Sequence, residues 1–440
     1  MSVTAWRGIR FARAGRFRAP ELVSLESLPE PGGSFGAAPV QPAGFDLGAP
    51  MAEDCHFLNV WAPAGATELP VLLYFYGGGF ERGAASLGFL DGAALAERVG
   101  CIVVTANHRV GALGFASLAH RGGALVKATN LGLRDARTAL EWVTRHIEAF
   151  GGDPSAITIA GQSSGGFIAT ATAVAPRADT VRALVTFSGA ASRVVPERLA
   201  RGMGDDLLAV LGIEDNPEQI LGLPAGTIIE AQSRVIAQDI GERNSRTPRA
   251  YGVAMDPSAS DPIVPVHPLE RIRGGALKEA LVLAAATTDE VEGFRATSVV
   301  PGDREAFDVE IARAADDRAP EIGARYVVDD LWAARQRFLS DYIYRLPAVR
   351  TAEAQRLAGG AGHTLDIGRD VGGEPALHGA ERLAVFAHGE TDRDREITDL
   401  FGRAIRGADL GDDILEVGVR PPGVVPAGDL AQLWEGVARP

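Results

Sequence analysis

Cysteine is scarce in this chain, which has only Cys55 and Cys101 in 440 residues. Two cysteines cannot build a disulfide framework, and neither lies in a spacing typical of a zinc site. We therefore expect both thiols to be reduced and to have structural roles. Nothing in the sequence calls for a metal or another cofactor.

Long apolar segments are also missing. The N-terminus has no apolar stretch of the kind that forms a secretory signal. No later segment reaches the ~18 uninterrupted apolar residues of a membrane span. These absences predict a cytoplasmic protein without a membrane partner.

Positive charge is in deficit, with 43 Lys and Arg against 57 Asp and Glu and a formal net charge of −14. An acidic surface repels phosphate backbones and anionic lipid, so we expect no nucleic-acid partner and no membrane partner. Solubility is the simplest explanation of the charge. The composition leaves the oligomeric state open.

Short apolar runs alternate with helical patterns along much of the chain. Runs that are apolar on both faces are typical of strands inside a parallel sheet. Helices are expected near 91–99, from about 133 to 150, where apolar residues recur three and four apart, and over 165–175. The alternation predicts an α/β fold with a mostly parallel, doubly wound sheet. The expected strands are 71–76, 101–105, 156–160, 183–187 and 281–286.

Two later segments, at about 194–268 and 301–350, are helical, polar and interrupted by prolines. No Ser/Gly-rich linker separates either segment from the predicted strands. We therefore interpret 1–440 as a single domain in which these segments are helical insertions above the sheet. The sequence has no internal repeat and no low-complexity tract.

A candidate nucleophile lies in a G-x-S-x-G pattern centred on Ser163. An apolar strand precedes it and a helix of small residues follows, which is the context of a sharp strand-to-helix turn that exposes a serine hydroxyl. The same pattern around Ser34 lies among prolines with no strand before it, so we set it aside. A serine at this turn needs a base, an orienting acid and donors for an oxyanion. The glycines 77–79, directly after a predicted strand, are candidates for those donors.

Several motifs together resemble the type-B carboxylesterase (cholinesterase-like) family of the α/β-hydrolase fold. They follow the family's order and spacing closely in the first half of the chain and in patches in the second. The motifs are WRGIRFA at 6–12, GRFRAP at 15–20, EDCHFLNVWAP at 53–63, YGGGF at 76–80, NHRVG at 107–111, NLGLRD at 130–135, FGGDP at 150–154 and GQSSGG at 161–166.

The resemblance implies that the backbone N–H groups of Gly78, Gly79 and Ser164 form the oxyanion hole. It also implies that the triad runs in the chain order Ser, acid, His. LHGAE at 377–381 resembles the family's histidine motif, so His378 is the expected base, with His388 as its nearest competitor.

The acid is less sharply defined by the resemblance. The family has an Asp-Glu pair shortly after a strand, and TTDEVEG at 287–293 follows the predicted strand at 281–286. Glu290 fits as the second member of that pair. Glu292 fits instead if the family motif is aligned on the glycine that follows it. We favour Glu290.

Four further charges are implied to be structural rather than catalytic. The resemblance pairs Arg16 with Glu53, and Arg137 with Asp153. Cys55 stands where secreted relatives have a disulfide cysteine, but the segment before it contains no partner, so we expect no bridge. The segment from about 20 to 50 holds no tryptophan, which makes specificity for choline esters doubtful.

The expected function is serine carboxylic-ester hydrolysis of a small-molecule ester through an acyl-enzyme. Two alternatives stay open at this stage. The same triad could act on carbamates or amides or transfer an acyl group to an acceptor other than water, and the chain could be a non-catalytic binding protein on a hydrolase scaffold. The sequence does not define the acyl and alcohol groups.

Overall fold

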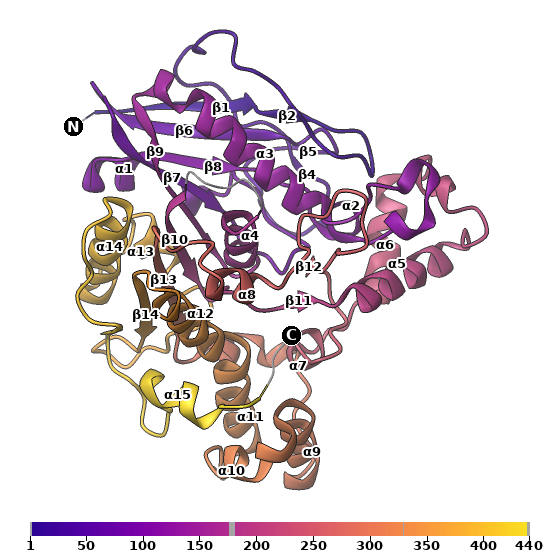
Figure 1. Ribbon diagram of the computed structural model, residues 1–440, viewed down its shortest axis with the longest axis vertical. Coiled ribbons are helices and arrows are strands. Elements are labelled where there is room, and N and C mark those ends of the chain that lie inside the picture. The colour runs from indigo at the N-terminus through magenta and orange to yellow at the C-terminus, as the bar shows by residue number, and fades with distance from the viewer. Residues whose placement is uncertain (1, 176–180, 329, 438–440) are drawn as a thin grey trace.

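A nine-stranded sheet forms the centre of the protein. The computed structural model describes residues 2–175, 181–328 and 330–437 (Figure 1). The strand order is β1-β6-β8-β7-β9-β10-β13-β14-β15. The strands are β1 (Val3–Arg10), β6 (Phe57–Pro63), β7 (Leu69–Phe75), β8 (Ile102–Ala106), β9 (Gly152–Gln162), β10 (Val181–Phe187), β13 (Leu281–Thr287), β14 (Gly362–Ile367) and β15 (Ile414–Val417).

Most of the sheet is parallel. Antiparallel pairing joins β1 to β6 and β6 to β8, and every pair from β8 across to β15 is parallel. Parallel neighbours need crossover connections, and helices in the chain provide them. The predicted α/β fold with a mostly parallel, doubly wound sheet is confirmed.

The two faces of β7 are both buried, which explains why its sequence is apolar almost throughout. Val71, Leu73 and Phe75 belong to the core on one face of the sheet. Leu72 and Tyr74 belong to the core on the other face. Neither set of alternate positions reaches solvent, so both must be apolar.

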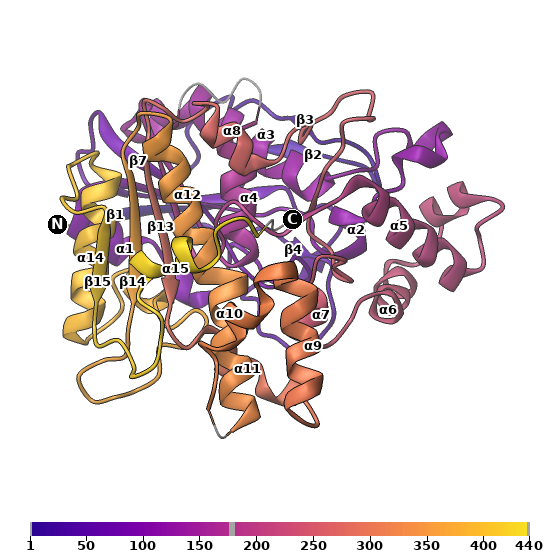
Figure 2. The same cartoon turned by 60° about the horizontal axis from the view of Figure 1, so that its bottom comes forward.

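Helices cover both faces of the sheet (Figures 1 and 2). One face packs against α3 (Leu131–His146), α4 (Ser164–Ala173) and α12 (Leu346–Leu357). The other face packs against α1 (Ala93–Val99) and α14 (Asp392–Ile405). The helix expected from about 133 to 150 is α3, which ends at His146 and continues as a single 3-10 turn to Phe150.

Most helices of the segments at about 194–268 and 301–350 lie away from the centre of the sheet. In Figure 1, α5 and α6 project on one side and α9, α10 and α11 gather at the bottom. They belong to the two segments at about 194–268 and 301–350. The α-helices of these segments are α5 (Glu197–Leu211), α6 (Ala225–Val235), α7 (Ile240–Arg243), α9 (Arg304–Ala315), α10 (Ala319–Gly323) and α11 (Leu331–Ser340). The other α-helices are α2 (Gly111–Phe115), α8 (Pro268–Arg273), α13 (Arg382–Val385) and α15 (Ala427–Leu433).

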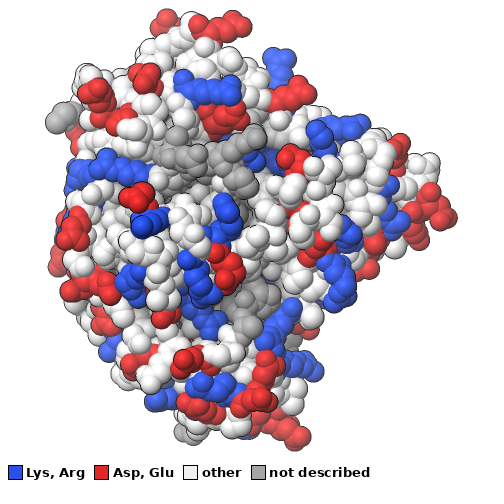
Figure 3. Space-filling view, viewed as in Figure 1, with Lys and Arg blue, Asp and Glu red and all other residues white. Residues whose placement is uncertain are grey.

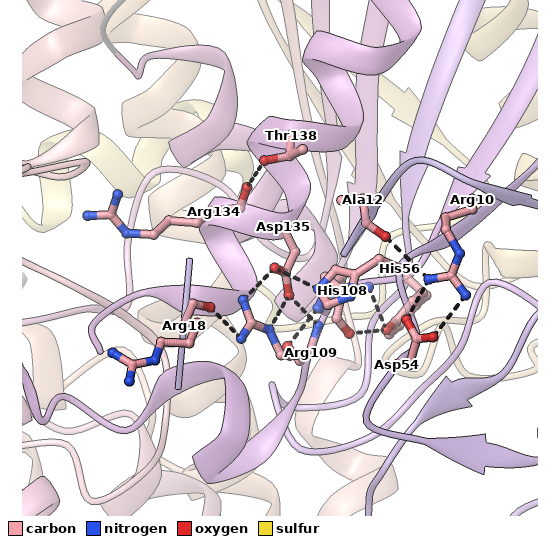
Figure 4. A network of polar contacts seen from close by, with 11 residues as sticks. Arg10, Ala12, Arg18, Asp54, His56, His108, Arg109, Arg134, Asp135 and Thr138 are labelled. Carbon is pink, nitrogen blue, oxygen red and sulfur yellow. Dashed lines mark hydrogen bonds and ion pairs between the residues drawn. The ribbon is translucent and has the colours of Figure 1, made fainter. Parts of the chain in front are cut away.

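A buried ionic cluster ties α3 to the first half of the sheet (Figure 4). The Asp135 carboxylate on α3 is fully buried and accepts hydrogen bonds from Arg109 Nε at 2.8 Å and Nη2 at 2.7 Å. His56 Nε2, just before β6, lies 3.0 Å from the same carboxylate. Burial by itself would raise the pKa of Asp135, but the charges of Arg109 and His56 hold that pKa far below its usual range. The cluster therefore keeps one ionised acid inside the core by surrounding it with donors.

One of the two expected structural ion pairs is present. Arg16 Nε donates to Glu53 Oε2 at 2.8 Å. The pairing of Arg137 with Asp153 is wrong, because Asp153 lies at the start of β9 and accepts instead from the backbone N–H and the hydroxyl of Ser155, at 2.8 and 2.7 Å. Those local bonds satisfy the Asp153 carboxylate without a distant partner.

Cys55 and Cys101 are both free and fully buried, as expected for reduced structural thiols. Burial raises the pKa of Cys101 to about 12. A protonated, inaccessible thiol is a poor nucleophile. Among the residues that the structure describes, no helix has the length and apolar character required to cross a membrane.

We expect Asp135→Asn to lower the free energy of unfolding by about 3–5 kcal/mol, because it leaves the Arg109 charge buried without its counter-ion. Urea unfolding measures this change. The wild-type advantage should be full above about pH 4 and shrink in more acidic solution, since the Asp135 pKa is lowered on folding.

The matched control is Glu141→Gln on the same helix, where Glu141 forms an exposed pair with Arg145. That change should alter stability by no more than about 0.5 kcal/mol. Equal effects of the two substitutions would contradict a stabilising role of the buried cluster.

Candidate active site

The predicted site residues all follow the carboxyl ends of neighbouring parallel strands. The glycine loop follows β7, Ser163 follows β9, Glu290 follows β13 and His378 lies in the loop after β14. Carboxyl ends of parallel strands meet at one edge of a sheet, which is where open α/β sheets bind ligands. Residues up to 300 positions apart in the chain are brought together in this way.

Ser163 occupies the sharp turn between β9 and α4. Its backbone has φ 54° and ψ −125°, a conformation that non-glycine residues rarely adopt. Hydrogen bonds hold the turn on both sides: Ser163 N donates to Phe187 O at 2.8 Å, and Ser163 O accepts from Gly166 N at 2.9 Å. The tertiary structure thus compensates for the local strain.

Gly165 makes this turn possible, because it lies directly against the end of β7. A Cβ atom at Gly165 would overlap the carbonyl oxygens of Phe75 and Tyr76. This close approach brings the first turn of α4 under the nucleophile. The N-terminus of α4 therefore points toward the site, where the helix dipole favours negative charge.

The glycine loop after β7 lies beside the nucleophile. A Cβ atom at Gly77 would be 3.0 Å from the Ser163 Cβ, and Gly78 adopts φ 139°, which is open only to glycine. Among the hydrogen bonds of the described residues, none uses the N–H of Gly78, Gly79 or Ser164 as its donor. The three predicted oxyanion donors are therefore available to a ligand.

His378 and Glu290 are in direct contact. His378 Nδ1 lies 2.6 Å from Glu290 Oε2. The Glu290 side chain is fully buried, and its other oxygen accepts from the Ser188 hydroxyl at 2.6 Å and from Thr287 N at 2.8 Å. These bonds fix the carboxylate, which in turn places the imidazole proton on Nδ1 and leaves Nε2 as an acceptor.

The two competitors lie elsewhere. Glu292 accepts a hydrogen bond from Trp332 Nε1 at 2.8 Å. His388 is exposed, and its Nε2 lies 3.0 Å from the carbonyl oxygen of Asp91. Neither residue contacts the Glu290–His378 pair.

The loop that carries His378 is held to the loop that carries Glu290. Asp289 N donates to Ala376 O at 3.1 Å, and Ala376 N donates to Asp289 Oδ2 at 3.2 Å. Arg369 Nη2 also donates to Asp289 Oδ1 at 2.7 Å. The Asp of the Asp-Glu pair thus positions the neighbouring histidine loop, a role that the sequence did not reveal.

Gln162, inside the G-x-S-x-G motif, is a second residue that the sequence analysis missed. Its side-chain nitrogen lies 3.3 Å from His378 Nε2 and donates to it, since that imidazole nitrogen is the acceptor. Nε2 is the atom that would have to take the Ser163 proton. Catalytic hydrogen bonds often tighten only with substrate bound, so the Ser163 hydroxyl would replace Gln162 at this nitrogen.

Glu381 is a buried carboxyl three residues after His378, just before α13. Both of its oxygens lack a hydrogen-bond partner among the described residues. Burial, and then the charge of Glu290, raise the pKa of Glu381 to about 7. The group is therefore largely neutral in mildly acidic solution.

A cavity of about 420 Å³ opens over these residues. Its lining includes Ser163, Gln162, His378 and the glycine loop. Its walls are mainly aromatic and aliphatic side chains, together with four arginines. The wall residues are Phe45, Leu47, Tyr74, Tyr76, Arg82, Leu87, Phe89, Arg193, Gln238, Ile240, Arg243, Phe294, Thr297, Tyr344 and Arg382.

A parallel sheet with helices on both faces and a serine at a strained strand-to-helix turn defines an α/β-hydrolase. The Carboxylesterase family model matches residues 1–361, and the chain belongs to that family. The resemblance found in the sequence motifs is confirmed.

Three curated relatives are similar over part of their length. Para-nitrobenzyl esterase of Bacillus subtilis (strain 168) is 31% identical over 299 residues, 66% of this chain and 59% of that protein. Acetylcholinesterase of Gallus gallus is 44% identical over 164 residues, 37% of this chain and 20% of the relative. Fumonisin B1 esterase of Sphingopyxis macrogoltabida is 41% identical over 169 residues, 37% of this chain and 27% of the relative. The matched segments thus span less than two thirds of each relative.

Solved structures match almost the whole chain. A PNB esterase aligns with a TM-score of 0.80 and 28% identity over 94% of this chain and 92% of that chain. A carboxylesterase of Geobacillus stearothermophilus aligns with a TM-score of 0.82 and 26% identity over 99% of this chain and 97% of that chain. The α/β-hydrolase architecture is shared from end to end.

We expect Gly165→Ala to disrupt the turn at Ser163, because the added methyl group must displace the end of β7. The free energy of unfolding, measured with urea, should fall by about 1–3 kcal/mol or more, which is typical of an overpacked core. The control is Gly202→Ala in α5, where an added Cβ meets nothing within 4 Å. That change should stabilise the protein slightly, by about 0.5–1 kcal/mol. Similar behaviour of both variants would refute the steric argument.

A separate prediction concerns pH and Glu381. Its pKa is about 7 in the folded protein and about 4.3 when unfolded, so the folded state binds the extra proton and loses stability as the pH rises through this interval. We expect Glu381→Gln to gain stability relative to wild type between about pH 5 and about pH 8. Urea midpoints at both pH values measure the gain.

The control for this experiment is Glu396→Gln, which changes an exposed carboxyl on α14. Its midpoint should follow the wild-type midpoint at both pH values. A difference between Glu381→Gln and wild type that does not change with pH would show that the carboxyl is not the titrating group.

Proposed function

We propose that the protein is a serine carboxylic-ester hydrolase that cleaves small-molecule esters through an acyl-enzyme. Ser163 is the nucleophile, His378 the base and Glu290 the orienting acid. The observation that carries the proposal is the 2.6 Å contact of His378 with the buried Glu290, at a cavity that also exposes Ser163. Membership of the Carboxylesterase family supports it.

In the first half of the reaction, the Ser163 hydroxyl attacks the ester carbonyl and His378 Nε2 takes its proton. The N–H groups of Gly78, Gly79 and Ser164 stabilise the oxyanion of the tetrahedral intermediate. Glu290 stabilises the imidazolium that forms. The intermediate then collapses, the C–O bond to the alcohol breaks, and His378 returns its proton to the leaving alcohol.

In the second half, water attacks the acyl-Ser163 carbonyl and gives a proton to His378. Collapse of the second tetrahedral intermediate releases the carboxylic acid, and His378 returns the proton to the Ser163 oxygen. All proton transfers use the chain's own residues. The free enzyme is restored.

The proposal treats 1–440 as one functional unit. The segment at about 194–268 contributes Gln238, Ile240 and Arg243 to the cavity wall, and the segment at about 301–350 contributes Tyr344. Tyr344 also packs against the His378 ring, with 4.7 Å between ring centroids. In this proposal the two insertions shape the substrate pocket. We propose in addition that the protein is cytoplasmic.

We expect Ser163→Ala to abolish hydrolysis of short-chain p-nitrophenyl esters and labelling by a fluorophosphonate, because both need the hydroxyl. The loss of kcat should reach several orders of magnitude. Thermal melting of the variant checks that it is folded. A wild-type protein that neither labels nor turns over these esters would overturn the proposal.

A second experiment separates the roles of two glutamates. Glu290→Gln keeps the size of the side chain but removes the charge that stabilises the imidazolium, so kcat should fall by roughly 10³–10⁴-fold. Glu292→Gln is the matched control, since Glu292 bonds Trp332 instead of His378. Its kcat should stay within about threefold of wild type. The reverse ranking would assign the acid to Glu292.

A further inference from the structure

The wall of the active-site cavity is cationic although the chain as a whole is acidic. Arg82, Arg193, Arg243 and Arg382 all line it, and no Asp or Glu is among its described lining residues. The chain carries 57 acidic against 43 basic residues. On the face of the molecule seen in Figure 3, side chains of both signs are interspersed. The composition therefore does not explain four arginines around one pocket.

Arg82 is the arginine least used by the fold. It is partly buried and lies in the segment that closes the glycine loop, with its N–H donating to Gly78 O at 3.1 Å. Its guanidinium stacks over the Phe45 ring at 4.8 Å. Within the described part of the chain, the guanidinium has no hydrogen bond and no ion pair. Its five N–H donors are thus available toward the cavity.

Arg382 has a similar position at the rim. It is exposed, its Nε donates to Gly379 O at 2.9 Å, and its guanidinium lies over the Phe89 ring at 5.2 Å. No carboxylate of a described residue pairs with it. Stacking on an aromatic ring fixes the plane of a guanidinium while leaving its donors free for a carboxylate.

Arg243 also lines the cavity, but its charge is paired within the protein. Its Nη1 donates to Ala237 O at 2.9 Å and its Nη2 pairs with Glu81. The same Nη2 would be 3.5 Å from a Cβ atom at Gly79. Because Glu81 offsets the charge of Arg243, the unpaired positive charge at the cavity comes from Arg82 and Arg382.

The alternative explanation is that these arginines only brace loops through their aromatic contacts. Bracing explains Arg243, which has two protein partners. It does not explain why Arg82, whose guanidinium has no polar partner among the described residues, lines the cavity that holds Ser163. Unpaired charge at a partly desolvated site is costly without a counter-ion, and here a ligand can supply one.

We propose that the cavity selects esters that carry a carboxylate in addition to the scissile ester, with Arg82 as its principal contact and Arg382 as the second. The inference rests on the proposed ester hydrolysis and names its substrate class. A carboxylate accepts two parallel hydrogen bonds from a guanidinium, which gives both strength and orientation. The carboxylate can belong to the acyl group or to the alcohol.

Two matched pairs of esters test this. Mono-p-nitrophenyl glutarate and p-nitrophenyl valerate share chain length and differ by a carboxylate on the acyl side. 4-Carboxyphenyl butyrate and 4-carbamoylphenyl butyrate differ in the same way on the alcohol side. We expect wild type to prefer the anionic member of at least one pair by about tenfold or more in kcat/KM, and the pair that responds identifies the side.

The variants test the assigned residues. Arg82→Gln should lower the anionic-to-neutral ratio of kcat/KM about tenfold, and Arg82→Lys should restore part of it. Arg382→Gln should lower the ratio by a smaller factor, and it serves as the test if Arg82→Gln does not fold. Arg198→Gln, an exposed position on α5 outside the cavity, changes net charge equally and should leave the ratio at the wild-type value.

Glutarate binding to Ser163→Ala, measured by calorimetry, separates the two proposals. Binding that depends on Arg82, without ester turnover by wild type, would support the anion site and overturn the hydrolase. Turnover of neutral esters at least as fast as their anionic partners in both pairs would overturn the anion selectivity and leave the hydrolase standing. A ratio unchanged by both arginine variants would also overturn the assignment.

Discussion

The structure of the site depends on one steric constraint, the close approach of the first turn of α4 to the end of β7. Gly165 allows that approach because any side chain there would overlap the Phe75 carbonyl. The approach fixes Ser163 in a backbone conformation with φ 54°, which the hydrogen bond from Ser163 N to Phe187 O maintains. It also brings the glycine loop after β7 to the nucleophile. The backbone of Ser163 and the position of the glycine loop are thus consequences of a single packing contact.

The contact between Glu290 and His378 depends on two further strands of the same sheet, β13 and β14. β13 and β14 are parallel neighbours, so the loops that follow them emerge side by side. Asp289 joins those loops through backbone and side-chain bonds to Ala376, and Glu290 can then reach His378. Glu290 is buried, and a carboxylate inside a protein needs hydrogen-bond donors to offset the cost of its desolvation. Ser188 and Thr287 supply two of them.

Charge is distributed differently in the core, on the surface and in the cavity. In the core, Asp135 is surrounded by Arg109 and His56, so its charge is matched within the protein. On the face seen in Figure 3, side chains of both signs are mixed. In the cavity, Arg82 and Arg382 face a space that contains no acidic side chain among the described residues. An unmatched cationic wall in an acidic protein is understandable when the matching charge arrives with the substrate.

Sequence patterns were sufficient to predict features that depend on residues close together in the chain. A run such as 71–76 had to be a strand buried on both faces, because both sets of alternate residues are apolar. The G-x-S-x-G pattern between a strand and a helix located Ser163, and the motifs around it led to the family. Glu290 was preferred to Glu292 from its Asp-Glu context, and the structure brings Glu290 to His378. The Arg137–Asp153 pair was wrong, since a local hydroxyl and amide satisfied Asp153 better than a distant cation.

Only the tertiary structure placed Gln162 at His378 Nε2, Ser188 at Glu290, Asp289 at the histidine loop and four arginines around one cavity. These contacts join residues from different strands and insertions, whose spacing in the chain carries no information about their distance in space. The sequence by itself determined the strands, the strand-to-helix turn at Ser163 and the family, because each depends on residues close together in the chain. The contacts of Glu290 and His378 and the charge of the pocket were decided by which strand ends and loops meet in the folded protein.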